Sequence, residues 1–592
     1  MVSITTRLVY IRMVMVMWKP MLTTYSEDAP IGDQWRYEVK YDGFRCGLEW
    51  KASRVTLWSR NGKELNDQFP EIIKACEENQ DAFENDLPLL LDCELVIPVT
   101  NLRTNFSELQ TRGRMKSTEA IAKKAAERPA KLYVFDLLKH TGKSLKKKTY
   151  QDRRNQLEKL FKKNPTKRLN LVTQYKDLTS IEEDVFLHQA EGILAKKVDS
   201  TYQENTRSKQ WLKIKNWRQV QGIVTGWNQA NDYYDLSVYD KQELVPLGKV
   251  KNGFPDDDRQ TLNQFIRENG QKLNQSTWQI PEGVCIEVNC LNARNGEIRE
   301  PLFNQFRFDL VPKECTWDRV QEQLAQLPED IDYSNLDKQL FSKARKVDLL
   351  IHLRKVAPLM LPHLYNKKLT VIRFPDGIYE ESFYQKHVPE YAPGYFQGNE
   401  HLVCNDLKSL IWLGNHAALE FHVPFNRLDE KNPREMVFDI DPPNQSKFPV
   451  AVKAAQLIKE LCDYKELVSI AKTSGRKGLQ IHIPTDGAWT YDETREFMET
   501  VAKVLVQKYP DLFTIERMKK NRGERVYIDF LQHAEGKTII APYSPRGQGN
   551  ATVATPLFWE EVNEDLDPND YTVFNVAERL RKKGCPFQYG QQ

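Results

Sequence analysis

The sequence predicts a multidomain α+β protein, and three observations along the chain support this prediction. Its 592 residues are enough for about three to five domains of ordinary size. Residues 35–100 contain short strand-like runs, and a Lys/Ala/Glu-rich helical stretch follows near 117–128, which is typical of an α+β domain. Residues 217–312 hold short alternating segments between Asn, Gly and Pro, which is typical of a small β-barrel. A second mixed domain begins at about 346.

The individual elements follow from runs of alternating or apolar residues that end at charged turns. The expected strands of the first domain are Trp35–Val39, Arg54–Trp58, Leu89–Leu95, Lys131–Leu137 and Gly192–Lys197, and those of the barrel are Gly222–Trp227, Tyr234–Tyr239 and Val284–Leu291. We therefore expect a leader at 1–17 and domains at 18–216, 217–312 and 346–592, with a polar linker at 313–345.

Composition excludes several classes of protein. The net charge of +3 neither favours nor excludes a nucleic-acid partner. Nine cysteines without a C-x-x-C pair argue against a disulfide framework or zinc ribbon and fit a reducing cytoplasm. No run approaches the roughly 20 apolar residues that would span a bilayer. Arg7 and Arg12 break up the start of the chain, so we expect a disordered leader or a first residue at Met15 or Met17 rather than a signal peptide.

A candidate nucleophile stands where an expected strand runs into a glycine turn. The string from Glu38 to Arg45 reads EVKYDGFR and contains Lys40. A lysine amine attacks only when it is deprotonated, so Lys40 needs partial burial and neighbouring cations to lower its pKa. The candidates for that positive field are Lys196, Lys213 and Lys215, and the last two share one face of a strand. The alternative reading is a solvated hairpin with a charged tip.

Further polar and aromatic residues follow in order at the ends or on one face of expected strands. They are Arg60, Glu94, Phe135 and Glu191. Glu94 and Glu191 offer the oxygen ligands that Mg²⁺ prefers. Phe135 is a candidate for stacking on a base. Each of these residues alone could be structural, but their order around one lysine favours a nucleotide site.

A second constellation lies in the last domain. Asp439 and Asp441 are one residue apart in a strand, so their carboxylates share a face, and Asp529 lies in a similar strand. Three converging carboxylates predict a two-metal site for nucleotidyl transfer. The loop between these strands carries Ser474 and Lys477 beside glycines, as a triphosphate cradle would. The alternative reading of the aspartates is a solvated acidic turn.

Aromatic and basic residues upstream of the aspartates suit a nucleic-acid end. Phe383 and Lys386 lie in the run FYQKH, where rings would stack on bases and cations would pair with phosphates. His422 follows Glu420 on an expected strand. The alternative readings are core packing for Phe383 and Tyr384 and a structural role for the histidine.

The first constellation resembles the motifs of covalent nucleotidyltransferases, which include DNA ligases, RNA ligases and capping enzymes. The resemblance implies an ATP-grasp-like domain in which Lys40 takes AMP and Glu38 lies near the adenine amino group. It implies ribose or phosphate contacts for Arg45 and Arg60, and α-phosphate contacts for Lys213 and Lys215. The segment Arg299–Asp309 resembles the last motif of ligase OB-fold domains. Cys93 departs from the usual glycine and would crowd a tight turn.

The last domain resembles the primase-like polymerase of bacterial end-joining ligases, the LigD family, which has the archaeo-eukaryotic primase type of α/β fold. The matching segments include D-x-D-P-P at 439–443, T-S-G-x-K-G at 473–478 and Ser544-Pro545-Arg546. The whole resemblance covers residues 18–585, in the order of the short Bacillus-type form, with no segment resembling a phosphoesterase domain. Gln480 and His533 depart from the family pattern, and we expect neither to touch the three aspartates.

The resemblance implies an ATP-dependent DNA ligase with a gap-filling, ribonucleotide-preferring polymerase that uses Mg²⁺ or Mn²⁺. It also implies action on double-stranded DNA ends with the Ku end-binding protein, as a monomer in the bacterial cytoplasm at the nucleoid. Two other functions are consistent with parts of the sequence. An RNA ligase or guanylyltransferase would also need the Lys40 motif, and an end-bridging scaffold would need no catalysis.

Overall fold

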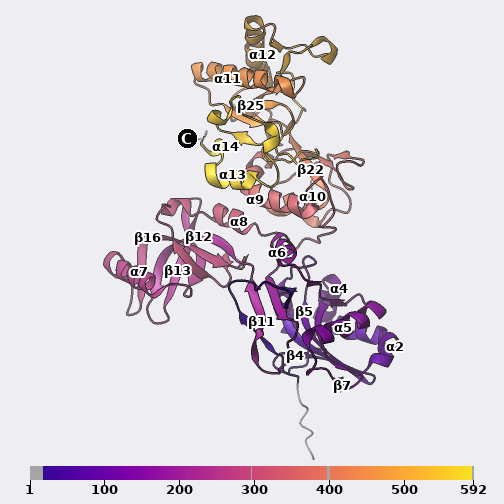
Figure 1. Ribbon diagram of the computed structural model, residues 1–592. Helices are drawn as coiled ribbons and strands as arrows, with labels where there is room; N and C mark the ends of the chain where they lie inside the picture. The colour runs from indigo at the N-terminus through magenta and orange to yellow at the C-terminus, as the bar shows by residue number, and fades with distance from the viewer. Residues whose placement is uncertain (1–17, 295, 397–399, 590–592) are drawn as a thin grey trace, which may run out of the picture. The chain divides into compact units, whose positions relative to one another are not determined.

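The chain folds into two compact units, residues 1–217 and 218–592, each with hydrophobic cores of its own. The computed structural model describes residues 18–294, 296–396 and 400–589 (Figure 1). The predicted leader, residues 1–17, therefore lies outside the described residues. Within the described ranges, no helix has the length and apolar character needed to cross a membrane.

The first unit contains two sheets with helices packed against them. One sheet has the order β1-β11-β10-β2-β9, with strands Leu22–Tyr25, Arg207–Lys215, Gly192–Lys197, Trp35–Lys40 and Gln174–Tyr175. The other runs β4-β3-β5-β6-β7 with β8 beside β6, and its strands are Arg54–Ser59, Phe44–Lys51, Leu89–Val96, Lys131–His140, Lys143–Ser144 and Leu169–Leu171. The helices are α1 (Pro70–Glu78), α2 (Gln80–Phe83), α3 (Phe106–Gly113), α4 (Thr118–Glu127), α5 (Tyr150–Lys163) and α6 (Leu178–Leu187).

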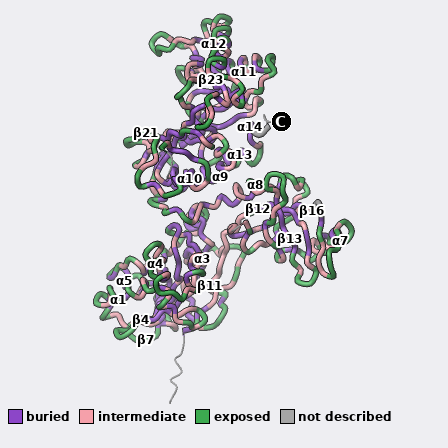
Figure 2. The backbone as a smooth tube through the Cα atoms, turned by 180° about the vertical axis from the view of Figure 1, so that it is seen from behind, coloured by how far each residue is buried: buried purple, intermediate pink, exposed green. Residues whose placement is uncertain are grey.

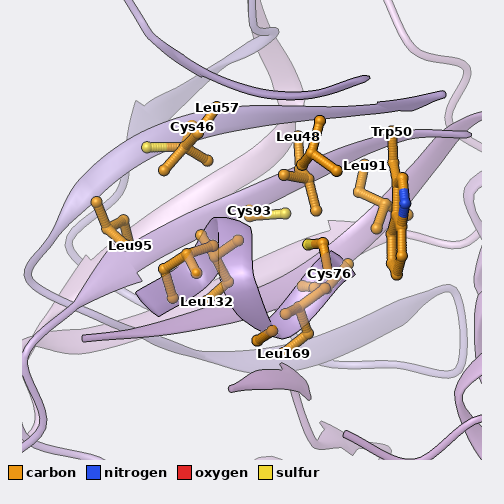
Figure 3. Close-up of a cluster of buried hydrophobic side chains, with 14 of the residues drawn as sticks. Cys46, Leu48, Trp50, Leu57, Cys76, Leu91, Cys93, Leu95, Leu132 and Leu169 are labelled. Atoms are coloured by element: carbon orange, nitrogen blue, oxygen red, sulfur yellow. The ribbon is translucent and has the colours of Figure 1, made fainter. Parts of the chain in front are cut away.

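Cys93 lies in the middle of a strand, so the expected tight turn at this position is wrong. It stands in β5 opposite Cys46 of β3, and both side chains are fully buried. Figure 3 shows these two cysteines among the leucines of the core. A cysteine is accommodated because it packs as a small apolar side chain in an extended backbone.

The second unit begins with a small antiparallel sheet around an apolar core. Its order is β14-β13-β12-β16-β15 with β19 beside β16, and the strands are Glu243–Val250, Tyr233–Asp240, Arg218–Asn228, Thr277–Cys290, Gln271–Lys272 and Leu302–Phe306. The ladders do not close completely over the described residues, but one bridge joins Asn252, just after β14, to Leu302 of β19. Partly open closure of this kind is usual for OB-folds. A short hairpin of β17 (Ala293–Arg294) and β18 (Glu297–Ile298) and the helix α7 (Asp256–Asn269) complete it.

The segment predicted as a linker, 313–345, carries the helix α8 (Trp317–Leu324). Thr316 caps this helix by accepting a hydrogen bond from the backbone N–H of Arg319. Val320 and Leu324 are buried and belong to the same apolar cluster as β12 and β16. The first part of the segment therefore packs as part of the small β domain.

The rest of the unit has two further sheets. One runs β21-β20-β22-β28, with strands Phe383–Gln385, Thr370–Arg373, Ala418–Val423 and Ile539–Ile540. The other runs β26-β27-β23-β25-β24-β29, with strands Phe513–Thr514, Val526–Asp529, Glu435–Asp441, Leu479–Pro484, Ile470–Thr473 and Pro556–Leu557. The helices are α9 (Lys346–Leu364), α10 (Leu407–Asn415), α11 (Phe448–Tyr464), α12 (Tyr491–Lys508), α13 (Val576–Lys583) and α14 (Pro586–Tyr589).

These helices bury apolar faces against the two sheets. α11 and α12 pack against each other and against β23, and α9 packs against α10 and β22. Figure 2 colours each residue by its burial, and along α12 exposed residues alternate with the buried ones that pack inward. A capping box between Thr490 and Glu493 fixes the start of α12. The mixed α/β architecture predicted for this part of the chain is confirmed.

Candidate active sites

Lys40 is the last residue of β2 and lies beside a carboxylate that immediately precedes the neighbouring strand, β10. β10 pairs with both β2 and β11, so Gly192 stands between Lys40 and Lys215 in one row. A Cβ at residue 192 would lie 2.1 Å from the carbonyl oxygen of Ile214, so this close approach of strands requires glycine. Glu191, the preceding residue, forms an ion pair with the Lys40 Nζ.

The electrostatic neighbours of Lys40 are acidic, and this corrects the expected role of the surrounding lysines. Burial lowers the pKa of Lys40, but the carboxylates of Glu191 and Glu94 outweigh it and leave the pKa raised. Burial also raises the pKa of Glu94 to about 8, against the opposing effect of nearby Arg45. The surroundings of Lys40 therefore raise its pKa, and the predicted lowering by neighbouring cations is wrong.

Lys196 is instead paired with Glu38 inside the unit. The Lys196 side chain is fully buried, and its Nζ lies 2.5 Å from Glu38 Oε2. Glu38 is 1% exposed and also accepts hydrogen bonds from the Tyr150 hydroxyl and, at 3.5 Å, from Arg154. No sequence motif points to Tyr150 and Arg154, which α5 brings in from more than 100 residues away. The contact predicted between Glu38 and adenine stays a prediction.

Arg45 is held by a second carboxylate, Asp92, that no sequence motif indicates. Its guanidinium makes two parallel hydrogen bonds to Asp92, at 2.6 and 2.7 Å, and Tyr202 donates a third to the same carboxylate at 2.6 Å. The Phe135 ring lies 4.3 Å from the Arg45 guanidinium carbon and 4.3 Å from Lys196 Nζ. Phe135 is thus buried with two cations close to its ring, and its stacking on a base stays a prediction.

The remaining predicted ligase-site residues lie on the rim of these strands. Arg60 is exposed, and its backbone N–H donates to the carbonyl of Arg45 at 3.1 Å. It lines a hollow with Trp18 and Asn205. Lys213 and Lys215 are alternate residues of β11, as predicted, and Lys215 Nζ lies 4.5 Å from the Trp217 ring. The phosphate contacts predicted for these cations stay predictions.

In the second unit the three predicted aspartates come from two adjacent strands. Asp439 of β23 pairs directly with Asp529 of β27, and Asp441 is two residues further along β23 on the same face. Burial and the charges of Asp529 and Asp441 together raise the pKa of Asp439 to about 6, against the lowering effect of a hydrogen bond from Gln480. The described residues contain no cluster of three or more His, Cys, Asp or Glu arranged as a metal site. The two-metal arrangement therefore stays a prediction.

Gln480 touches the aspartates, so the expectation that it does not is wrong. Its Nε2 donates to Asp439 Oδ1 at 3.1 Å, while its Oε1 accepts from Lys472 Nζ at 2.5 Å. Period-two alternation on β25 puts residue 480 on the face of the aspartates, a signal present in the sequence. His533 contacts Thr494 instead, at 3.0 Å, as expected for a residue remote from the aspartates.

Basic residues also reach Asp441 from two loops. Lys477 Nζ lies 3.3 Å from Asp441 Oδ1, and Arg522 Nη1 lies 3.6 Å from Oδ2. The turn before Lys477 is fixed by Ser474, whose Oγ accepts from the backbone N–H groups of Arg476 and Gly478. Gly475 adopts φ +70° in this turn, a conformation that favours glycine. Arg522 was not predicted from the sequence.

Arg546 and His422 converge on one buried carboxylate, Glu420. His422 Nε2 lies 2.9 Å from Glu420 Oε2, and Arg546 Nε and Arg476 Nη2 lie 3.4 and 3.0 Å from Oε1. These partners hold the pKa of Glu420 at about 2 despite its burial. His422 and Arg546 thus meet at one carboxylate, and the contact of these two residues, Ser474 and Lys477 with a nucleotide stays a prediction.

The aromatic run at 383–386 forms an exposed strand edge. Phe383 and Tyr384 of β21 are 44% and 70% exposed, so the core-packing alternative is wrong. Arg373 lies 5.1 Å from the Phe383 ring, and Lys386 is exposed just after the strand. Aromatic rings and a cation are therefore exposed to solvent at the same strand edge, and DNA-end binding at this edge stays a prediction.

The folds and sites define an enzyme with two nucleotidyl-transfer domains. The model of the ATP dependent DNA ligase domain matches residues 20–215, and that of the LigD primase-polymerase domain matches residues 345–587. The chain is 39% identical to the Bacillus subtilis bifunctional non-homologous end joining protein LigD, over 96% of this chain and 95% of that protein. The chain belongs to the LigD family of end-joining enzymes and contains an ATP-dependent DNA ligase domain and a polymerase domain.

Two other relatives extend this comparison. The multifunctional LigD of Pseudomonas aeruginosa is 25% identical over 95% of this chain and 70% of that protein. The solved polymerase domain of Mycobacterium tuberculosis Ligase D, in complex with DNA, is 28% identical with a TM-score of 0.41, covering 44% of this chain and 97% of that chain. The ligase domain implies ATP and a divalent metal as cofactors, and the family does not favour an RNA-processing enzyme or a scaffold without catalysis.

Proposed function

We propose that Lys40 and the three aspartates carry two successive nucleotidyl transfers that repair double-strand breaks. The observation that supports this most directly is the Lys40 amine at a strand end, beside Glu191 and near Glu94. In the same chain, Asp439 and Asp529 are cross-strand neighbours in the polymerase domain. Polymerase action would fill the gap before the ligase seals the remaining nick.

In the ligase domain the Lys40 Nζ attacks the α-phosphorus of ATP. The Nζ–P bond forms, the bond to pyrophosphate breaks, and AMP remains on the lysine. Because the pKa of Lys40 is raised, its proton must leave first, and Glu191 is the hydrogen-bonded carboxylate suited to accept it. The AMP then passes to a 5′-phosphate, and a 3′-hydroxyl displaces it to seal the nick.

The carboxylates fit the divalent metal that both reactions need. Glu94 and Glu191 would hold it in the ligase domain, and Asp439, Asp441 and Asp529 would hold Mg²⁺ or Mn²⁺ in the polymerase domain. Burial raises the pKa of Glu94 to about 8 and that of Asp439 to about 6. The protein therefore does not fully compensate the negative charge of these carboxylates, and a bound cation would stabilise it. When bound, the cation offsets charge that develops on the phosphates. Oxygen donors are the ligands that both metals prefer.

In the polymerase domain a primer 3′-hydroxyl attacks the α-phosphorus of a nucleotide. Ser474, Lys477 and Arg546 would bind the triphosphate through backbone N–H groups and cations, with His422 beside them. Phe383 and Lys386 would hold the DNA end by stacking and by phosphate pairing. By family membership we propose a preference for ribonucleotides, a partnership with the Ku protein at double-stranded ends, and monomeric action in the cytoplasm at the nucleoid.

The first test is the mass of the purified chain after incubation with ATP and Mg²⁺. We expect a gain of one AMP in the wild type and none in Lys40→Ala. The matched control is Lys209→Ala, because Lys209 is an exposed lysine of β11 outside the proposed site. A wild type without the gain, or a Lys40→Ala variant with it, would contradict the assignment of the nucleophile. Parallel incubation with GTP tests the capping-enzyme alternative.

A further inference from the structure

Four polar side chains stand in one row across the polymerase sheet. β-pairing aligns Asp529 with Asp439, Asp439 with Gln480, and Gln480 with Lys472. Side chains in one such row project from the same face of a sheet and reach one another directly. The row therefore leads from two of the proposed metal ligands to a lysine two strands away.

The orientation of the Gln480 amide follows from its partners. Lys472 Nζ lies 2.5 Å from Gln480 Oε1, and an ammonium can only donate hydrogen bonds, so the amide oxygen must face the lysine. The amide nitrogen then faces Asp439 Oδ1, at 3.1 Å, and donates to it. Both partners are therefore compatible with the same one of the two possible orientations of the amide.

Burial makes this arrangement rigid. Lys472 is fully buried and Gln480 is 3% exposed. The acceptors of the Lys472 ammonium are neutral oxygens: Gln480 Oε1, the carbonyl of Ile540 at 3.2 Å and that of Thr473 at 3.5 Å. Asp439, on the far side of Gln480, is the carboxylate whose charge does most to stabilise the ammonium. The glutamine therefore links a buried cation to a buried carboxylate.

We propose that Lys472 and Gln480 are positioning residues for Asp439 in nucleotide addition. The hydrogen bond from Lys472 fixes the orientation of the Gln480 amide, and the amide N–H donates to Oδ1 of Asp439. The carboxylate is then fixed in rotation, with its other oxygen left for the reaction centre that it shares with Asp441 and Asp529. This inference rests on the proposed polymerase function, and it concerns two residues that would touch neither nucleotide nor DNA.

A purely structural role is the competing explanation, because the same contacts tie β23, β24 and β25 together. A structural role predicts that substitutions lower stability without changing turnover by the folded fraction. A positioning role predicts a fall in kcat for nucleotide addition while KM for the nucleotide stays near the wild-type value. Second-layer partners of metal ligands typically contribute about 10- to 100-fold in activity.

The test uses the full chain with Mn²⁺, a primer–template with a gap, and one nucleotide. We expect Gln480→Leu and Lys472→Met each to lower kcat about 10- to 100-fold. The double variant should match the worse single variant within about 2-fold, because both changes remove the same contact. His482→Leu is the matched control, since it breaks a buried link on the same strand, to Glu435, away from Asp439.

Gln480→Glu keeps the proposal testable if the other variants fold poorly. It retains an acceptor for Lys472 but replaces the amide N–H that Asp439 accepts with an oxygen, so kcat per folded molecule should fall. Turnover equal to that of His482→Leu, or losses that multiply in the double variant, would overturn the positioning role. Failure of the wild type to add any nucleotide, with Lys40 still adenylylated, would instead refute the polymerase function itself.

Discussion

A few charged side chains hold the ligase site in shape, and Asp92 is the clearest case. Its carboxylate is fully buried and accepts hydrogen bonds from Arg45 and Tyr202. Those bonds hold the Arg45 guanidinium against the Phe135 ring. A buried ion pair costs most when only one partner is removed, because the other charge then has no compensation.

We therefore predict that Asp92→Asn destabilises the first unit by about 3 kcal/mol and slows adenylylation of Lys40. The loss of charge leaves Arg45 with a single neutral acceptor, so the guanidinium shifts from the Phe135 ring. Denaturant unfolding and the rate of AMP uptake measure the two effects. Glu71→Gln weakens another largely buried pair in the same unit, with Arg112, and should cost stability without slowing AMP uptake. Equal rates in the two variants would contradict the prediction.

Sequence motifs select candidate catalytic residues but do not predict the residues that surround them. The order of motifs was enough to select Lys40, Glu191 and the three aspartates, because chemistry fixes their types and local spacing. Tyr150 and Arg154 could not be selected, since they reach Glu38 from 112 and 116 residues away. The predicted positive surroundings of Lys40 were also wrong. Lys196 pairs with Glu38 instead, and this pairing depends on which faces of the strands meet.

Elements were predicted best where one period of hydrophobicity dominates. Gly192–Lys197 is a strand with the expected bounds, and Trp35–Val39 is one residue short of β2. α9 is harder to recognise, because Pro358 and Pro362 lie inside it and most of its faces are buried. A helix that is apolar on nearly all sides shows little amphipathic pattern. Its stability comes from the surrounding core, and that core includes a buried histidine.

His352 on α9 predicts that acid destabilises the second unit. Burial lowers its pKa from 6.5 to about 4, and the ring bonds to the Tyr543 carbonyl at 3.0 Å. Above pH 6.5 the ring is neutral in both states, whereas between 6.5 and 4 only the unfolded chain takes up the proton. Stability should therefore fall as pH falls through this range, by on the order of 3 kcal/mol for this residue.

The variant His352→Gln isolates this contribution, because glutamine can donate to the same carbonyl but does not titrate. Unfolding free energies at pH 8 and pH 5 should differ less in the variant than in the wild type. The measurement at pH 8 gives the packing cost of the substitution, and the difference between the two pH values gives the proton uptake. An unchanged difference would mean that the ring is already protonated in the fold or stays neutral in both states.

The edge strand β21 gives a prediction about DNA. Phe383 and Tyr384 are exposed, so Phe383→Ala with Tyr384→Ala should change stability by no more than about 0.5 kcal/mol. Loss of stacking should weaken binding to a DNA end by about 1–3 kcal/mol for each base involved. Fluorescence anisotropy with a labelled overhang measures this. Tyr464→Ala removes another exposed ring, 81% exposed at the end of α11, and should bind as the wild type does.

Over the whole molecule, the residues proposed for the two chemistries lie in separately packed units. The first unit carries Lys40 on sheets packed around their own apolar clusters, and the second carries the aspartates on a different sheet with a different cluster. Composition and element patterns predicted this mixed α/β organisation, since each unit has its own alternation of strands and helices.

Separate cores predict separate unfolding. Leu48 is fully buried in the first unit and Ile481 in the second, and neither lies in a proposed site. Truncating a buried leucine or isoleucine to alanine costs about 2–5 kcal/mol. If each core stabilises only its own unit, Leu48→Ala lowers the midpoint of the unfolding transition at which Lys40 adenylylation is lost. Nucleotide addition should stay intact. Ile481→Ala should do the reverse, whereas a single shared transition lowered by either variant would show that the units unfold together.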